Sequence, residues 1–233
     1  MAEIEGLVHA VREGDDAAKT AAVRAVRYPA SWSDKGAIAA AGGVPLLVEL
    51  LRDGSAKAKF EAAAALWKLA CEDNQVLIAE AGGVPPLVDL LRHGSADAKE
   101  QAAMALDDLA AGIPANQVLI AEAGGIPPLV ELLRDGSAEA KVEAAMALDD
   151  LAFNNDSNAV AIAATVGFEA LVQLARRGRV TVDDETLVSD AGIAAKRKAA
   201  LVVAELLRAC VPAKVRNQTW VRYLIRRVIG PYL

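Results

Sequence analysis

The stretch NQVLIAEAGGVPPLVDLLRHGSADAKEQAAMALDDLA, residues 74–110, recurs without a gap as NQVLIAEAGGIPPLVELLRDGSAEAKVEAAMALDDLA at residues 116–152. The two copies are identical at 31 of 37 positions. Glycines extend the same period of 40 to 42 residues along the chain, with pairs at 42–43, 82–83 and 124–125 and a single glycine at 167. A period of this length is typical of proteins built from stacked helical repeats.

Start and stop signals inside each copy predict three helices. The first helix, for example residues 116–123, ends at a Gly-Gly pair, because glycine adopts the left-handed conformation of a helix C-cap. The second begins at the prolines of IPPLVELLRDG, which a first helical turn tolerates, and ends at Gly136. The third has Ser137 as its N-cap and runs to Ala152. The equivalent N-cap positions of the other copies hold Ser95, Ser55 and Asp15.

The composition favours an all-helical, soluble protein. Of the residues, 54% are hydrophobic and only 4% are aromatic, so the apolar content is mostly small Ala, Leu and Val side chains. No window reaches the ~20 uninterrupted apolar residues of a membrane span, and the N-terminus carries acids where a secretory signal would carry bases. We therefore expect an intracellular protein, cytoplasmic or nuclear. Cys71 and Cys210 match no metal spacing and predict neither a disulfide nor a zinc site.

A unit of three helices with one apolar stripe buries that stripe by stacking on its neighbours. The pattern Gly-Gly-Val/Ile-Pro-Pro-Leu-Val-Asp/Glu-Leu-Leu followed by Ala-Ala-x-Ala-Leu-x-x-Leu-Ala resembles the armadillo repeat over nearly the whole chain. The resemblance implies an all-α, right-handed α-solenoid that acts as a non-catalytic protein-interaction module. The expected divisions are a partial first repeat (1–35), three regular repeats (36–73, 74–115, 116–157), an irregular repeat (158–211) with an inserted loop (179–191), and a C-terminal capping helix (212–233).

A helical wheel places the acids of the third helix opposite its leucines. Advancing about 100° per residue puts Met104, Asp108 and Glu100 on one face, with Asp107 toward the edge of that face. We therefore expect the acids of AAMALDDLA on the solvent-exposed face and not in the core. The equivalent positions of successive third helices form what we call the inner row, namely Arg24; Ala64 with Lys68; Met104 with Asp108; Met146 with Asp150; and Leu201 with Glu205.

The resemblance assigns this face to peptide binding. In armadillo proteins, Trp and Asn residues four apart on the third helices bind an extended peptide; here Met104 and Met146 take the Trp place, and Asp108 and Asp150 take the Asn place. An ionised Asp accepts hydrogen bonds but donates none, so these positions select Lys or Arg side chains over generic backbone contacts and argue against a nuclear-import cargo receptor. The expected groove comprises Arg24, Lys68, Glu100, Met104, Asp107, Asp108, Met146, Asp149, Asp150, Leu201 and Glu205. The alternative is that the acids only make the surface soluble.

Other chemistries fit the sequence less well. Adjacent acids on a helix diverge by about 100°, so the doublet does not converge on one substrate, and we expect no enzyme activity. His9 and His93 are the only histidines and belong to different repeats, which argues against a metal site. The GGVPP and GGIPP segments continue into prolines that lack N–H donors, so they do not predict a phosphate loop. We expect no cofactor.

Charge is divided between an acidic body and a basic end. Residues 1–205 hold 19 bases and 31 acids, a net charge of −12, whereas residues 206–233 hold six bases and no acid. The acidic body argues against nucleic acid as a ligand. The segment 212–233 places Trp220, Leu224 and Val228 on one stripe, which predicts a cap on the last repeat. Alternatives are contact of its bases with a membrane surface, a partner, or the acidic row of a second copy, which would make the protein a self-associating scaffold. The chain also fits one domain of a larger adaptor.

Overall fold

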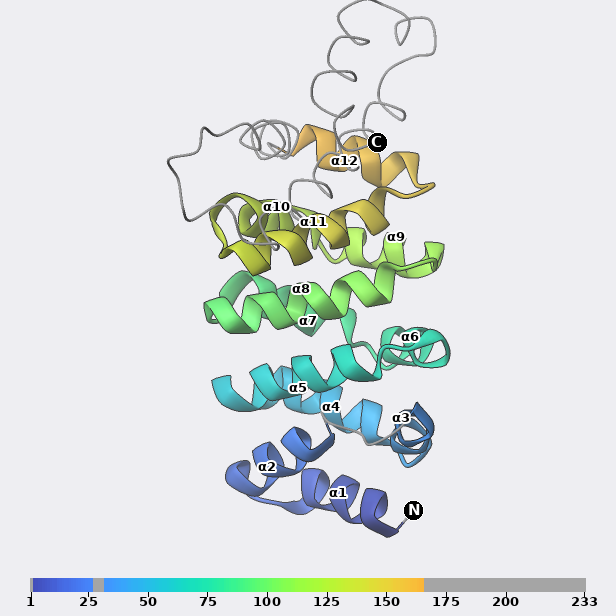
Figure 1. The fold of residues 1–233 in the computed structure, drawn as a ribbon, viewed down its shortest axis with the longest axis vertical. Helices are drawn as coiled ribbons and strands as arrows, with labels where there is room; N and C mark the ends of the chain where they lie inside the picture. The colour runs from blue at the N-terminus through green and yellow to red at the C-terminus, as the bar shows by residue number, and fades with distance from the viewer. Residues whose placement is uncertain (1, 27–31, 166–233) are drawn as a thin grey trace, which may run out of the picture. The chain divides into compact units, whose positions relative to one another are not determined.

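The computed structural model describes residues 2–26 and 32–165, and every regular element in these ranges is an α-helix (Figure 1). The chain divides into two compact units, Met1–Leu109 and Ala110–Leu233, which are described separately. The helices of the first unit are α1 (Ala2–Glu13), α2 (Asp16–Val26), α3 (Trp32–Ala40), α4 (Gly43–Asp53), α5 (Ala56–Leu69), α6 (Glu72–Glu80), α7 (Val84–His93) and α8 (Ala96–Ala110), the last of which ends one residue into the second unit. The second unit has α9 (Pro114–Glu122), α10 (Ile126–Asp135), α11 (Ala138–Ala152) and α12 (Asp156–Ala164) in its described part.

The predicted helix boundaries follow the capping chemistry. Ser137 accepts a hydrogen bond from the backbone N–H of Ala140 at 3.0 Å, which confirms it as the N-cap of α11. The side chains of Ser55, Ser95 and Asp15 accept the corresponding bond at the start of α5, α8 and α2. Prolines occupy the first turn of α7 and α10, as expected. Left-handed glycines stop the first helices, with φ of 79° at Gly42, 78° at Gly82 and 75° at Gly124.

In the first unit, pairs of helices follow one another in layers, α1 with α2, then α4 with α5, then α7 with α8 (Figure 1). Third helix α2 contacts third helix α5, and second helix α4 contacts second helix α7. The core is built from leucine, valine and alanine, and Leu66 and Leu106 are fully buried. Small alanines let helix backbones approach closely, which suits a core with few aromatic residues.

The start of α7 depends on a glycine. A Cβ atom placed on Gly83 would lie 2.8 Å from Ile78 Cγ2 and 2.9 Å from the Ile78 carbonyl oxygen. It would also lie 3.4 Å from Cγ2 of Val48, which belongs to the preceding second helix. The second glycine of the Gly-Gly pair therefore allows α7 to pack close to α6 and α4 in the same unit, whereas the first supplies the left-handed turn.

In the second unit, α10 packs against α11, and α12 packs against α9, α10 and α11. Leu129, Leu148 and Leu151 are fully buried between these helices. Asn158 is 5% exposed, and its Nδ2 donates to the carbonyl oxygens of Leu151 at 3.0 Å and Gln117 at 3.1 Å. A buried amide therefore joins α12 to the end of α11 and to α9.

The all-α prediction is confirmed over the described ranges. None of the helices in these ranges has the length and apolar character needed to cross a bilayer. The expected inserted loop (179–191) and capping helix (212–233) lie outside the described residues, and so do Leu201, Glu205 and Cys210.

Candidate functional site

The inner row begins with an ion pair between two third helices of the first unit. Arg24 on α2 donates from Nε and Nη2 to Oε1 of Glu61 on α5, at 3.0 and 2.8 Å. The Glu61 side chain is 4% exposed and the Arg24 side chain is 54% exposed. The positive charge of Arg24 is therefore paired with Glu61. This pairing partly neutralises the basic charge that was expected at the first position of the inner row. The sequence interpretation did not select Glu61, which lies three residues before Ala64 of the row.

On α5 the row contributes a lysine covering a tryptophan. Ala64 is fully buried, so it offers a binding partner no side-chain surface. Lys68 is half-buried, with Nζ 3.5 Å from the centroid of the Trp67 ring. A cation at this distance from an indole face is attracted by the ring electrons. Trp67 is a second residue that sequence reasoning missed, although its position matches Asp107 and Asp149 in the later repeats.

On α8 the acid doublet divides into two environments. Met104, Asp108 and Glu100 are half-buried. Asp107 is only 5% exposed, so the expectation that both carboxylates lie on a solvated face is wrong for this residue. The physical reason is its place at the edge of the helical face, about 60° from Met104 and therefore nearer the leucine side of the helix. Asp108 is the member of the doublet that a ligand can reach in the first unit.

On α11 of the second unit, Met146, Asp149 and Asp150 are all half-buried. The last turns of α8 and α11 contain no basic residue, whereas the last turn of α5 contains Lys68. A helix C-terminus carries about half a negative charge from its unpaired carbonyl groups. Asp108 and Asp150 therefore add a full charge to helix ends that are already negative, and each of these ends attracts a cation.

Two glutamines hold the helix ends that carry these acids. Nε2 of Gln75 donates to the carbonyl oxygen of Asp108, and Nε2 of Gln117 donates to that of Asp150 at 2.8 Å. Both glutamines are buried, at 8% and 2% exposed, and belong to the first helix of the same repeat. Each glutamine thus places a side-chain donor on a backbone carbonyl in the last turn of the third helix. The signal for this role is the Asn-Gln pair repeated at 74–75 and 116–117.

An exposed ion pair lies elsewhere in the second unit, at the end of α10. The Nη2 of Arg134 lies 2.8 Å from Oδ2 of Asp135. The hydrogen bond from Arg134 lowers the pKa of the Asp135 carboxyl, and the same bond raises the pKa of Arg134. Both side chains are more than half exposed, so the pair is a surface feature of α10 outside the inner row.

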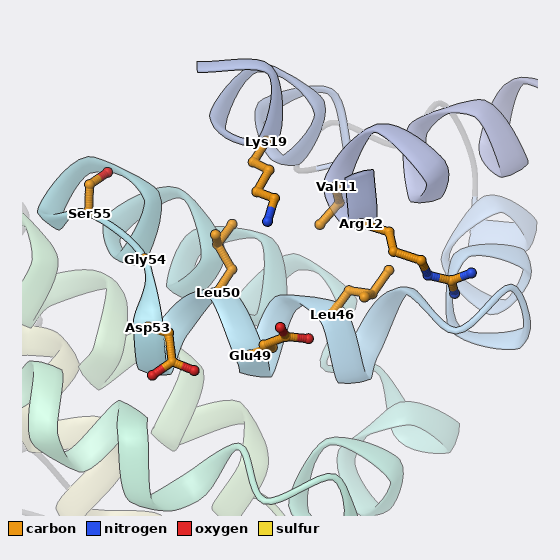
Figure 2. A pocket seen from close by; sticks show the side chains of 9 residues that line it. All are labelled: Val11, Arg12, Lys19, Leu46, Glu49, Leu50, Asp53, Gly54 and Ser55. Atoms are coloured by element: carbon orange, nitrogen blue, oxygen red, sulfur yellow. The ribbon is translucent and has the colours of Figure 1, made fainter. Parts of the chain in front are cut away.

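A hollow in the first unit lies between the second helices α1 and α4 (Figure 2). Its volume is about 250 Å³, below the range of roughly 300–1,000 Å³ usual for small-molecule sites. Lys19 reaches from α2 toward Leu50 on α4 in Figure 2. The lining mixes apolar with charged side chains of both signs and contains no inner-row residue: Val11, Arg12, Lys19, Leu46, Glu49, Leu50, Asp53, Gly54 and Ser55.

Residues 2–26 and 32–165 contain no group of three or more His, Cys, Asp or Glu side chains arranged to hold a metal ion. His93 is exposed, and its Nε2 lies 3.7 Å from Oδ1 of Asp89, one turn earlier on α7. In the inner row, Met104 with Asp108 on α8 and Met146 with Asp150 on α11 each place a carboxylate one helical turn after a methionine, and all four side chains are half-buried.

Comparison with known proteins identifies the repeat. The family model for armadillo/beta-catenin-like repeats matches three segments, 34–71, 71–110 and 114–149. Solved structures with a similar fold include an engineered protein with 29% sequence identity and a TM-score of 0.77, covering 100% of this chain and 97% of that one. A designed armadillo repeat protein has 25% identity and a TM-score of 0.78, covering 98% and 90% of the two chains. Computationally designed armadillo repeat proteins for modular peptide recognition include one with 25% identity and a TM-score of 0.76, covering 99% and 100%.

A comparison with curated proteins finds no significant match. The three family matches follow one another along the chain, and the similar solved structures extend the likeness to almost its full length. The protein is all-helical over its described residues, as an armadillo solenoid is. The chain belongs to the armadillo repeat family.

Proposed function

We propose that this protein binds an extended polypeptide through the inner-row faces of its third helices and prefers lysine or arginine side chains at α8 and α11. Armadillo repeat proteins are generally binding scaffolds rather than catalysts. One similar solved structure is a design for modular peptide recognition. These two findings support a polypeptide as the partner class.

The observation that carries the preference for bases is the last turn of α8, repeated in α11. Each turn places a half-buried aspartate one helical turn after a half-buried methionine, Asp108 after Met104 and Asp150 after Met146. Residues four apart lie on the same face of a helix. A lysine or arginine packs its aliphatic stem on the flexible methionine and directs its charge to the carboxylate and the negative helix end.

Binding of a fluorescently labelled peptide of alternating lysine and serine tests the proposal. The double variant Asp108→Ala/Asp150→Ala removes one charge per site and introduces no amide that could bind the peptide backbone. Exposed or half-exposed ion pairs contribute about 0.2–1 kcal/mol each, so the affinity falls roughly 2- to 30-fold, and the difference shrinks as salt is raised.

A matched control removes the same charge from another surface. Glu80 and Glu122 end the first helices α6 and α9, at equivalent positions of two repeats, and both are exposed. We expect the double variant Glu80→Ala/Glu122→Ala to keep wild-type affinity apart from a small loss at low salt. Equal losses in the two double variants would show that net charge alone attracts the peptide, and the proposed surface would be wrong.

A further inference from the structure

Arg24 occupies an unusual place for a base. It takes the inner-row position that Met104 and Met146 take on later third helices, and it crosses from α2 to α5 to reach Glu61. Both residues belong to the first unit, in which α2 and α5 are in contact. The inner row at this point therefore presents an arginine side chain already bound to a carboxylate.

The geometry around Glu61 is that of a site for a guanidinium group. Nε and Nη2 of Arg24 converge on one oxygen, Oε1, at 3.0 and 2.8 Å. The carboxylate side chain is 4% exposed, and an ionised carboxylate at that depth is strongly unfavourable without a cation. The arginine side chain is 54% exposed, so it enters the site from the surface. Both donors come from one edge of a planar guanidinium, a fixed arrangement that a lysine ammonium does not have.

We propose that Glu61 forms a guanidinium-binding site in the inner row, and that Arg24 occupies this site in cis and keeps an arginine of a bound peptide out of it. The second part rests on the proposed function, because the competing ligand is a basic peptide. The self-occupied site closes the α2–α5 end of the row and directs basic side chains to α8 in the first unit. Arg24 therefore determines which peptide side chains the row accepts. When Arg24 is replaced by alanine, a small guanidinium cation can take the place of its side chain beside Glu61.

Thermal unfolding of full-length variants in ethylguanidinium tests the site. Arg24→Ala leaves the buried carboxylate without its guanidinium and lowers the Tm by roughly 5–10 °C. Ethylguanidinium chloride restores part of this loss, whereas ethylammonium chloride at the same concentration does not. In Arg24→Ala/Glu61→Gln ethylguanidinium lowers the Tm more than ethylammonium does, because guanidinium salts denature proteins and the carboxylate that binds the cation is gone. Glu61→Gln is a matched change, because α8 carries the buried Gln101 at the equivalent position. If the difference in Tm between the two salts is the same in Arg24→Ala as in Arg24→Ala/Glu61→Gln, the site is overturned.

Peptide binding tests the exclusion by Arg24. An arginine-serine peptide binds Arg24→Ala roughly 3- to 30-fold more tightly than it binds wild type, and this gain is absent in Arg24→Ala/Glu61→Gln. If ethylguanidinium restores the Tm of Arg24→Ala but the peptide binds this variant no more tightly than wild type, Arg24 does not keep a peptide arginine away from Glu61. If no basic peptide binds wild type or any variant, the proposed peptide-binding function fails, while the response to ethylguanidinium still decides whether Glu61 is a guanidinium site.

Discussion

Replacing Asn158 with leucine tests how much the buried amides stabilise the stack of helices in the second unit. The side-chain amide of Asn158 is buried, and its two N–H groups reach carbonyl oxygens on α11 and α9 at 3.0 and 3.1 Å. Leucine has nearly the same size and shape but no donor. The substitution therefore removes both hydrogen bonds while keeping most of the packing.

The expected loss follows from the two carbonyl groups left behind. Leaving a buried polar group without its partner costs about 1–3 kcal/mol, and the added apolar surface of leucine offsets part of that. The free energy of unfolding falls by about 2–4 kcal/mol in total. For a chain of this size, each kcal/mol lowers the Tm by roughly 2–4 °C, so the Tm falls by roughly 4–16 °C.

Asn158→Asp extends the test with a pH dependence. The carboxylate faces the oxygens of Leu151 and Gln117, so folding favours its protonated form and raises its pKa above the unfolded value of about 3.9. The destabilisation is then largest above the raised pKa and lessens as the pH falls through it, because the protonated acid donates one hydrogen bond. Asn158→Leu shows no such recovery.

Urea unfolding followed by circular dichroism measures the global effect, and hydrogen exchange of α12 amides detects local opening of that helix. Val160→Asn is the control, because Val160 lies on the same helix and is 51% exposed. It changes the free energy of unfolding by less than about 0.5 kcal/mol. If Asn158→Leu is equally mild and α12 exchanges as in wild type, the buried amide does not hold α12 in place.

Three further substitutions test local chemistry. Ser137→Ala removes the N-cap bond of α11 and lowers the free energy of unfolding by about 1 kcal/mol in urea denaturation; no change would show that solvent replaces the cap. Gly83→Ala lowers the free energy of unfolding by about 1–3 kcal/mol, because the new Cβ atom would meet Ile78. Gly36→Ala is the control, since a Cβ atom at Gly36 inside α3 meets open space, and it raises the free energy of unfolding by about 0.5–1 kcal/mol. Equal effects of the two substitutions would refute the packing explanation. Arg134→Ala raises the pKa of Asp135 toward its ordinary value in an NMR titration; the stability that this pair adds is present at neutral pH and is lost as the pH falls through the lowered pKa.

Much of the fold follows from local signals in the sequence. The serine N-caps, the prolines of the second helices and the left-handed glycines act within a few residues of the helix ends that they set, so their effect is readable from the chain alone. The structure confirms these boundaries at Ser55, Ser137 and Gly124. The family matches confirm the armadillo identity inferred from the repeated motif.

The candidate site is less predictable from sequence. A helical wheel gives the direction of a side chain from its own helix but not what lies opposite it. It therefore placed Asp107 on a solvated face, although that residue is buried, and it did not reveal that Glu61 receives Arg24. The pairing of Arg24 with Glu61 depends on a helix 37 residues away in sequence.

The sequence by itself determined the period, the three helices of each repeat and the residues available to the third-helix faces, because capping and periodicity are local properties. Only the tertiary structure decided which of those residues remain accessible. Packing buries Asp107 and leaves Asp108 half-exposed, and it pairs Arg24 with Glu61 across two helices. The physical reason is that burial and charge pairing depend on atoms from separate repeats, which come together only when the helices stack.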